Sequence, residues 1–195
     1  MNWKSEAYSR VWGFTLMELM VVVAIIAIVS AAVVPSFSMS LRRNRQREAA
    51  NLIVQAVFAA RSRAARTGRC HRVVIATDDT KQDGGTGGSV RVDEYRAQSA
   101  ECGNANNTAN WQQLSSKIVG SLVGEDVAIF RVVKNDCTSV LVSKGSTVTM
   151  RFEPTGGVYI GDAAERFFEI VTEGVSVNRH VRISTGGSVK YTMCE

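Results

Sequence analysis

The sequence predicts an α+β fold, in which one long N-terminal helix packs on an antiparallel β-sheet or β-sandwich. Apolar residues run without interruption, and then at helical spacing, from Phe14 to Thr67. From Cys70 onward the pattern changes to short, partly alternating apolar runs separated by turns rich in Gly, Asn and Asp, which is typical of antiparallel strands. We therefore expect a helix over residues 14–67 and a globular β domain over residues 68–195.

The first half of the expected helix is an apolar run with one carboxylate near its start. Between Leu19 and Val34 there is no charged residue, and Ser30 is the one polar side chain. A helix from Phe14 to Val34 would be about 31 Å long at 1.5 Å per residue, which matches a hydrocarbon core of about 30 Å. We therefore expect a transmembrane segment at about residues 14–34, with Glu18 just inside its start.

Two other interpretations of this run fit the residues less well. Soluble helices normally keep a polar face, which disfavours a buried core helix. A cleaved secretory signal needs small residues after the apolar region. Ser30-Ala31-Ala32 has such residues, but Val33, Val34 and Pro35 follow. The segment before the run, Met1 to Arg10, is short and mildly positive, as expected of a cytoplasmic leader.

The start of the helix carries the sequence Gly13-Phe14-Thr15-Leu16-Met17-Glu18-Leu19, followed by a run rich in Val, Ile and Ala that ends at Pro35. This pattern resembles the type III signal of type IV pilins and type II secretion pseudopilins. The resemblance implies that a prepilin peptidase removes residues 1–13 and methylates the new amine of Phe14. It also implies the type IV pilin fold, and assembly contacts in which Glu18 pairs with the amino terminus of a neighbouring subunit.

The chemistry of a carboxylate in lipid agrees with this role for Glu18. Inserting such a group costs roughly 2.5–3.5 kcal/mol, and intramembrane carboxylates usually have a partner. Pairing with an amine across subunits would offset part of that cost and favour one register of assembly. A membrane-anchored β domain without cleavage after Gly13 is the plainer alternative.

The second half of the helix should be amphipathic. Pro35 removes a backbone donor, so we expect a kink there. Beyond it, apolar residues recur at spacings of three and four, opposite arginines, and should pack on the β domain; they are Phe37, Leu41, Ala49, Leu52, Ile53, Ala56, Val57, Ala60 and Ala64. Four arginines, Arg42, Arg43, Arg45 and Arg47, should be solvated, or meet lipid phosphates or neighbouring subunits. Gly68 suits the end of the helix.

Four cysteines follow the apolar run: Cys70, Cys102, Cys137 and Cys194. An exported domain would allow two disulfides. Three connectivities remain open, of which we favour Cys70–Cys102 with Cys137–Cys194. The arginines after the run conflict with the positive-inside rule. The signal and the cysteines outweigh them, so we expect a single-pass protein of the inner membrane with its C-terminal domain in the periplasm, and later an extracellular pilus.

The β domain should contain nine strands: 72–76, 90–96, 118–123, 127–133, 140–142, 147–152, 167–172, 179–184 and 189–193. The first two should form a hairpin whose long tip, Asp78 to Ser89, is mobile. Residues 97–116 are polar and should form an exposed loop. The tip departs from a calcium loop, because Lys81 occupies a ligand position and Val90 stands where a glutamate belongs.

A second resemblance lies in this domain, in Met150-Arg151-Phe152-Glu153-Pro154-Thr155-Gly156-Gly157 and Val181-Arg182-Ile183-Ser184-Thr185-Gly186-Gly187. Both stretches resemble the soluble domain of the GspH/FimT/FimU group of minor pilins and minor pseudopilins. The resemblance implies a minor pilin at the pilus tip or in its priming complex. Its partners would be the prepilin peptidase and, through the helix, other minor and major pilins. A minor pseudopilin of type II secretion, a DNA-binding competence pilin and a major pilin are the alternatives.

Some members of that group bind DNA through a C-terminal Gly-Arg-x-Arg hairpin. The matching stretch here, Gly187-Ser188-Val189-Lys190, lacks both arginines. Nucleic-acid contact would depend on Arg179, Arg182 and Lys190, through salt-sensitive attraction to phosphate. The sequence contains no nucleophile elbow, and its two histidines, His71 and His180, lack metal-site spacing. We therefore expect a structural protein without metal, cofactor or catalytic activity.

Overall fold

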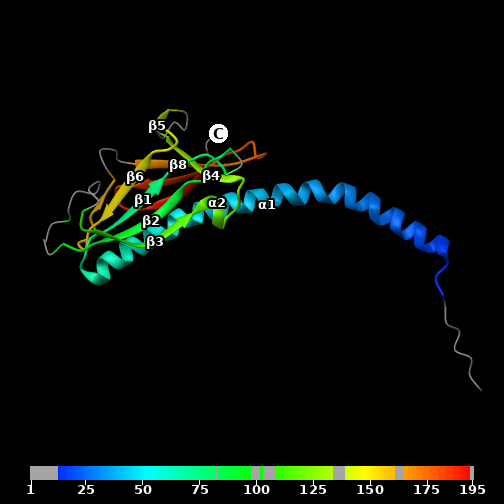
Figure 1. The fold of residues 1–195 in the computed structure, drawn as a ribbon, viewed down its shortest axis with the longest axis horizontal. Helices are drawn as coiled ribbons and strands as arrows, with labels where there is room; N and C mark the ends of the chain where they lie inside the picture. Colours follow the sequence, from blue (N-terminus) through cyan, green and yellow to red (C-terminus); the bar gives the residue numbers. More distant parts are fainter. Residues whose placement is uncertain are drawn as a thin grey trace, which may run out of the picture. The chain divides into compact units, whose positions relative to one another are not determined.

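The computed structural model describes residues 13–81, 83–97, 102, 109–133, 139–160 and 165–193, without the side chains of residues 32–36, 165 and 193. Four expectations therefore lie outside the described residues: those for the leader segment Met1 to Arg10, the side chain of Pro35, Cys137 and Cys194. The described part of the chain confirms the α+β class, with one long helix and antiparallel sheets (Figure 1).

The long helix is α1, Leu16–Thr67. Thr15 caps its start, because the Thr15 hydroxyl accepts a hydrogen bond from the backbone N–H of Glu18 at 3.1 Å. Thr15-x-x-Glu18 is the sequence pattern of a capping box, which supplies a partner for backbone donors of the first turn. At the other end Gly68 has φ +65° and its N–H donates to the carbonyl of Ala64. That left-handed residue ends the helix at little steric cost.

The chain divides into two compact units, Met1–Ser38 and Met39–Glu195, and α1 contributes to both. In the second unit α1 buries one stripe at helical spacing: Gln46, Ala49, Ala50, Ile53, Val57, Ala60 and Ala64. Its alanines let the helix axis approach the sheets closely. The predicted amphipathic pattern is correct from Ala49 onward. It is wrong for Phe37 and Leu41, which are 64% and 42% exposed.

Ten strands form two sheets. They are β1 His71–Ala76, β2 Ser89–Tyr95, β3 Trp111–Ile118, β4 Val127–Val133, β5 Val140–Val142, β6 Thr147–Phe152, β7 Val158–Tyr159, β8 Glu165–Thr172, β9 Arg179–Ser184 and β10 Val189–Met193. One sheet has the order β3-β2-β1-β6-β7 and the other β10-β9-β8-β4-β5. Every pairing is antiparallel.

Both sheets share one hydrophobic core with α1. The first sheet contributes Val73 and Met150 among others, and the second contributes Phe168 and Ile183, all fully buried. Because each strand alternates its side chains between two faces, one face of each sheet reaches this core. The helix stripe completes it, so neither sheet covers its apolar face without α1.

Two predictions about the middle of the chain are wrong. The polar segment predicted as a loop includes strand β3, which pairs with β2 from Tyr95↔Trp111 to Ser89↔Ile118. β3 is an edge strand, and its side chains are mostly exposed. It forms through backbone pairing with β2. Because neither of its faces is buried, its sequence does not show the alternation of apolar and polar residues that predicts a strand. The strand predicted at residues 118–123 is instead the short helix α2, Val119–Leu122.

The glycine-rich tip of the β1–β2 hairpin was predicted to be mobile, and the structure contradicts this. The tip folds back onto β4 and α2: Gly87 N–H donates to Asp79 O, Ile129 N–H to Gly87 O, and Gly120 N–H to Thr86 O. Gly88 has φ +78°, and a methyl group there would lie 2.5 Å from the carbonyl oxygen of Ala76. The glycines therefore allow close packing of backbone on backbone.

Asp78 fastens the same segment. Its carboxylate accepts hydrogen bonds of 2.8 Å from both the N–H and the hydroxyl of Thr86. Burial, the largest single influence, raises the pKa of Asp78, but the hydrogen bonds from Thr86 and from the N–H of Asp79 together lower it below its usual value. The carboxylate is therefore ionised at neutral pH and holds the turn closed.

We predict that Gly88→Ala destabilises the protein far more than Gly84→Ala. Both glycines have positive φ, but a methyl group at Gly84 meets nothing within 4 Å. Gly84→Ala should therefore cost only the left-handed strain, about 1–2 kcal/mol, whereas Gly88→Ala adds a backbone collision and should cost about 3 kcal/mol or more. Urea unfolding of the full chain in neutral micelles measures both; equal losses would contradict the packed tip.

Candidate functional site

The expected processing site lies before α1. Gly13 and Phe14 are exposed and have no regular secondary structure. The Phe14 side chain is 83% exposed, and nothing lies within 4 Å of a Cβ built at Gly13. The peptide bond between them is therefore open to another protein.

Glu18 lies in the first turn of α1 and is exposed. Its backbone N–H bonds to Thr15. Its carboxylate makes no hydrogen bond or ion pair with any residue that the structure describes. The structure thus leaves this carboxylate open to a partner from outside the chain.

The helix surface around Glu18 is apolar and uncovered. All residues from Gly13 to Ala31 are exposed. The large apolar side chains among them are Phe14, Leu16, Met17, Leu19, Met20, Val21, Val22, Val23, Ile25, Ile26, Ile28 and Val29. Burying one such side chain fully is worth roughly 1.5–3 kcal/mol, so water is an unfavourable surrounding for this surface.

No helix within the described part of the chain is apolar over a length sufficient to cross a membrane, so the structure does not support the span expected at about residues 14–34.

Two of the four arginines after the apolar run bind within the protein. Arg42 donates to the carbonyl oxygen of Glu173 at 2.8 Å, and Arg45 forms an ion pair of 2.9 Å with the buried carboxylate of Asp126. Both side chains are exposed, as expected, but each also bonds to a defined group of its own chain. Arg43 and Arg47 are exposed and have no carboxylate partner among the described residues.

Gln46 is a positioning residue that sequence reasoning missed. It is 3% exposed, and its amide N–H₂ group donates to the carbonyls of Ile170 at 3.0 Å and Val177 at 3.2 Å. It thereby ties α1 to β8 and to the turn between β8 and β9. The sequence did contain a signal for this role: Gln46 is a polar residue at a position where the spacing of the apolar helix stripe calls for an apolar one.

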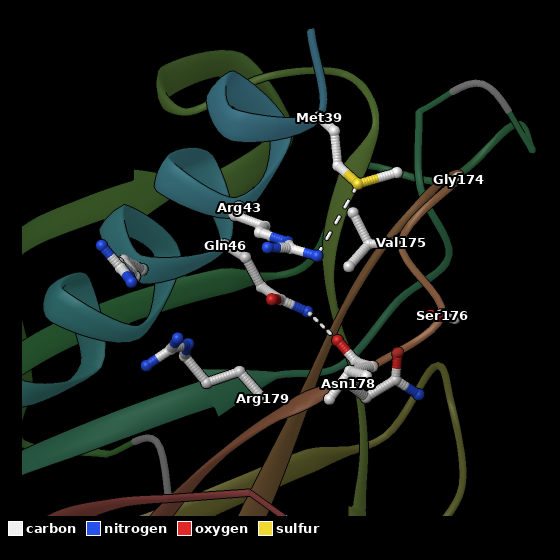
Figure 2. A pocket seen from close by; sticks show the side chains of 10 residues that line it. Met39, Arg43, Gln46, Gly174, Val175, Ser176, Asn178 and Arg179 are labelled. Atoms are coloured by element: carbon white, nitrogen blue, oxygen red, sulfur yellow. Dashed lines mark hydrogen bonds between the residues drawn. The ribbon is translucent and has the colours of Figure 1, made fainter. Parts of the chain in front are cut away.

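Arg43, Gln46 and Arg47 line a pocket of about 390 Å³ together with Met39 and the turn between β8 and β9, residues 174–179 (Figure 2). Arg43 contacts the sulfur of Met39 at 3.6 Å. Arg179 enters from β9 and extends toward α1 (Figure 2). None of the ten described lining residues is acidic, so the pocket carries an excess of positive charge.

Cys70 and Cys102 form a disulfide, with Cα atoms 5.7 Å apart. The bond joins the residue before β1 to the connection between β2 and β3. Arg151 of β6 donates to the Cys102 carbonyl at 3.3 Å, which fixes this connection to the sheet.

The three predicted nucleic-acid candidates do not share one surface. Arg182 and Lys190 are cross-strand partners on β9 and β10, and the Arg182 guanidinium lies 5.7 Å from the Phe167 ring centroid. Arg179 is three residues from Arg182 on β9, so it faces the opposite side of the sheet. It lines the pocket beside α1 instead.

His180 is buried on the face of the second sheet where Glu169 and Arg131 form an ion pair. Neither ring nitrogen has a hydrogen-bond partner among the described residues. Burial lowers the pKa of His180; Glu169 opposes this and Arg131 adds to it. Burial likewise lowers the pKa of His71. Both rings are therefore neutral at pH 7 in the folded protein.

Comparison with known proteins identifies the signal. Residues 13–34 match the family model described as the prokaryotic N-terminal methylation motif, which confirms the prepilin-type signal. No curated protein matches the chain. Two crystal forms of the type IV minor pilin FimU from Pseudomonas aeruginosa are similar to it. One has 17% identity over 78% of this chain and 97% of that chain, TM-score 0.44. The other has 16% identity over 76% and 99%, TM-score 0.42.

The class of protein follows from the signal and the fold. A methylation motif leads directly into a long helix, and the second half of that helix packs on antiparallel sheets. The chain therefore joins a prokaryotic N-terminal methylation motif to a long helix that packs on antiparallel sheets.

We predict that Gln46→Ala costs about 2–3 kcal/mol of unfolding free energy, because it removes a buried hydrogen bond to Ile170 and a part-buried one to Val177. Asn51→Ala is the matched control: this α1 amide bonds to Tyr191 at an exposed site and should cost less than 1 kcal/mol. Urea unfolding of the full chain in neutral micelles measures both. Similar losses for the two variants would contradict the anchoring role of Gln46.

We predict that acid weakens the fold through its histidines. Each histidine has a lower pKa in the folded protein than in the unfolded chain, where it is about 6.5. Its contribution to stability is therefore fully present above pH 6.5 and is lost as the pH falls from 6.5 toward the folded pKa. The free energy of unfolding should fall between pH 7 and pH 5. In His180→Phe the fall should be smaller, because only His71 still contributes to it. Urea unfolding at the two pH values measures it; an unchanged drop in His180→Phe would contradict the prediction.

Proposed function

We propose that this chain is a minor pilin: a structural subunit of the tip or priming complex of a type IV pilus, which promotes pilus assembly. One observation carries the proposal. The first half of α1 exposes a continuous apolar surface with an unpaired carboxylate, Glu18, directly behind a methylation motif. Such a surface suits burial against the same segment of other pilins.

Processing supplies the complementary charge. Removal of residues 1–13 creates a methylated amine at Phe14, one helical turn from Glu18. Each mature subunit then has one cation and one anion at the same end of its helix. Pairing Glu18 of one subunit with the Phe14 amine of the next neutralises those two charges. Each of the two subunits then keeps one unpaired charge, which can pair with a further subunit. This contact is heterologous, and repeated heterologous contacts build a filament.

Before assembly, the proposal places the apolar run in the inner membrane, as a single pass with the β domain in the periplasm. The uncharged sequence from Leu19 to Val34 supports this location, and so does the disulfide between Cys70 and Cys102, which requires an oxidising compartment. The prepilin peptidase would act at the exposed bond after Gly13. After assembly the subunit belongs to the extracellular pilus.

The proposal gives the chain a structural role. The β domain would present surface to other minor and major pilins.

Two alternatives remain distinct. A minor pseudopilin of the H type would assemble by the same helix, and deleting the gene would then abolish protein secretion instead of piliation. A DNA-binding competence pilin would depend on the C-terminal hairpin. The division of Arg179 and Arg182 between two sheet faces does not favour it. DNA binding would have to appear in a gel shift of the full chain at ~50 mM salt.

We predict that Glu18→Val reduces incorporation into pili at least tenfold while leaving membrane insertion intact, because the amine of the neighbour loses its partner. Glu48→Val removes another exposed carboxylate of α1 and should incorporate normally. Immunoblots of sheared pili and of membranes measure the two pools. Mass spectrometry of each variant should find a mature chain that starts at methylated Phe14, which shows that processing is unaffected. Normal incorporation of Glu18→Val would refute the proposal.

A further inference from the structure

The pocket beside α1 gathers arginines that the fold does not use. Arg42 and Arg45, on the same stretch of helix, bind Glu173 and Asp126. Arg43, Arg47 and Arg179, which line the pocket, form no ion pair with any described residue. The Nε atom of Arg179 is buried without a hydrogen-bond partner. Buried donors normally have partners, so this wall of the pocket can take an acceptor that the described residues do not supply.

The neighbouring carboxylates do not fill that need. The Glu173 side chain accepts from the hydroxyl of Thr80 at 2.6 Å. Glu169 accepts from Asn178 at 2.6 Å and pairs with Arg131. Asp126 is taken by Arg45. Among the described residues no carboxylate therefore pairs with the three guanidinium groups of the pocket, and guanidinium forks match the oxygens of phosphate and carboxylate.

Beside the arginines the lining is mixed: Gln46, Ser176 and Asn178 are polar, and Met39, Val175 and Val177 form an apolar part. Met39 and Val177 are 47% and 51% exposed at the pocket, and Val175 lies beside Met39 (Figure 2). A carboxylate side chain or a free phosphate has no use for such a surface. A phospholipid headgroup offers a phosphate for the arginines and ester and acyl groups for the apolar side chains.

The place of the pocket residues in the sequence agrees with binding of a lipid headgroup. Met39 and Arg43 follow Val34, the end of the apolar run, by five and nine residues. Nine helical residues rise about 14 Å, the headgroup layer of a bilayer is about 5–8 Å thick, and helix side chains lean toward the N-terminus. The long side chain of Arg43 thus reaches back toward phosphates at the membrane surface. Arg47, thirteen residues beyond Val34, lies about 20 Å along the helix, so it meets only a headgroup drawn into the pocket.

We propose that this pocket binds the headgroup of an anionic phospholipid, with Arg43, Arg47 and Arg179 on the phosphate and with Met39 and Val177 against its apolar part. This inference rests on the proposed storage of the subunit in a membrane. Arg42 and Arg45 hold α1 to the sheets and leave the pocket arginines for lipid. Binding would stabilise the β domain before assembly by mass action.

The test follows thermal unfolding of the full chain in neutral micelles during titration with phosphatidylglycerol, phosphatidylcholine or inorganic phosphate. Phosphatidylglycerol should raise the unfolding temperature by about 5 °C at saturation, and the other two should not. In Arg43→Gln/Arg47→Gln, which changes two exposed side chains, the apparent affinity should fall at least tenfold. Arg63→Gln/Arg66→Gln removes the same charge from the end of α1 and should bind as the unchanged protein does.

Arg179→Lys keeps the charge but loses the guanidinium fork, and should also weaken binding; circular dichroism checks that each variant is folded. Equal loss in both double variants, or an equal effect of inorganic phosphate, would overturn the lipid assignment. A rise in the unfolding temperature that depends on protein concentration and not on lipid would also overturn the lipid assignment, because it would indicate a second copy of the chain in the pocket. Flotation with vesicles separates the two proposals. A chain that does not float contradicts membrane storage, whereas a chain that floats without any effect of phosphatidylglycerol contradicts only the pocket.

Discussion

The fold of this protein depends on the contact between the alanine-rich stripe of α1 and the two sheets. Ala49, Ile53 and Ala60 are fully buried there, and the inward faces of both sheets meet the same stripe. Apolar contact alone has little directional preference. Gln46 and Arg45 add direction. Gln46 bonds to the carbonyls of Ile170 in β8 and Val177 in the turn after it, and Arg45 pairs with Asp126, the residue before β4. Together these bonds fix the position along α1 at which the sheets pack and the face of α1 that they contact.

The sequence predicted those parts of the fold that repeat. The helix bounds and most strands follow from periodicity, since a buried face imposes a spacing of 3.6 residues in a helix and 2 in a strand. β6 is an example: Val148, Met150 and Phe152 are buried and alternate with more exposed residues. The signal at residues 13–34 carries its own motif.

Other parts depend on partners far away in the sequence, and local patterns do not reveal them. β3 forms because β2 supplies backbone partners, although its side chains are polar and exposed. The tip at Gly87 and Gly88 packs because β4 and α2 come within reach of its backbone. The roles of the arginines were equally hidden. Arg42 and Arg43 are adjacent in sequence, yet one bonds to Glu173 and the other lines the pocket.

The division of roles along α1 has a mechanical consequence. The side-chain bonds that hold α1 to the sheets begin at Arg42 and Gln46, whereas the continuous exposed stretch from Gly13 to Ala31 precedes them. The two sets of residues do not overlap. A change in the surroundings of that stretch therefore breaks none of these bonds. Under the proposed function, a subunit built this way passes from lipid to neighbouring helices without refolding its β domain.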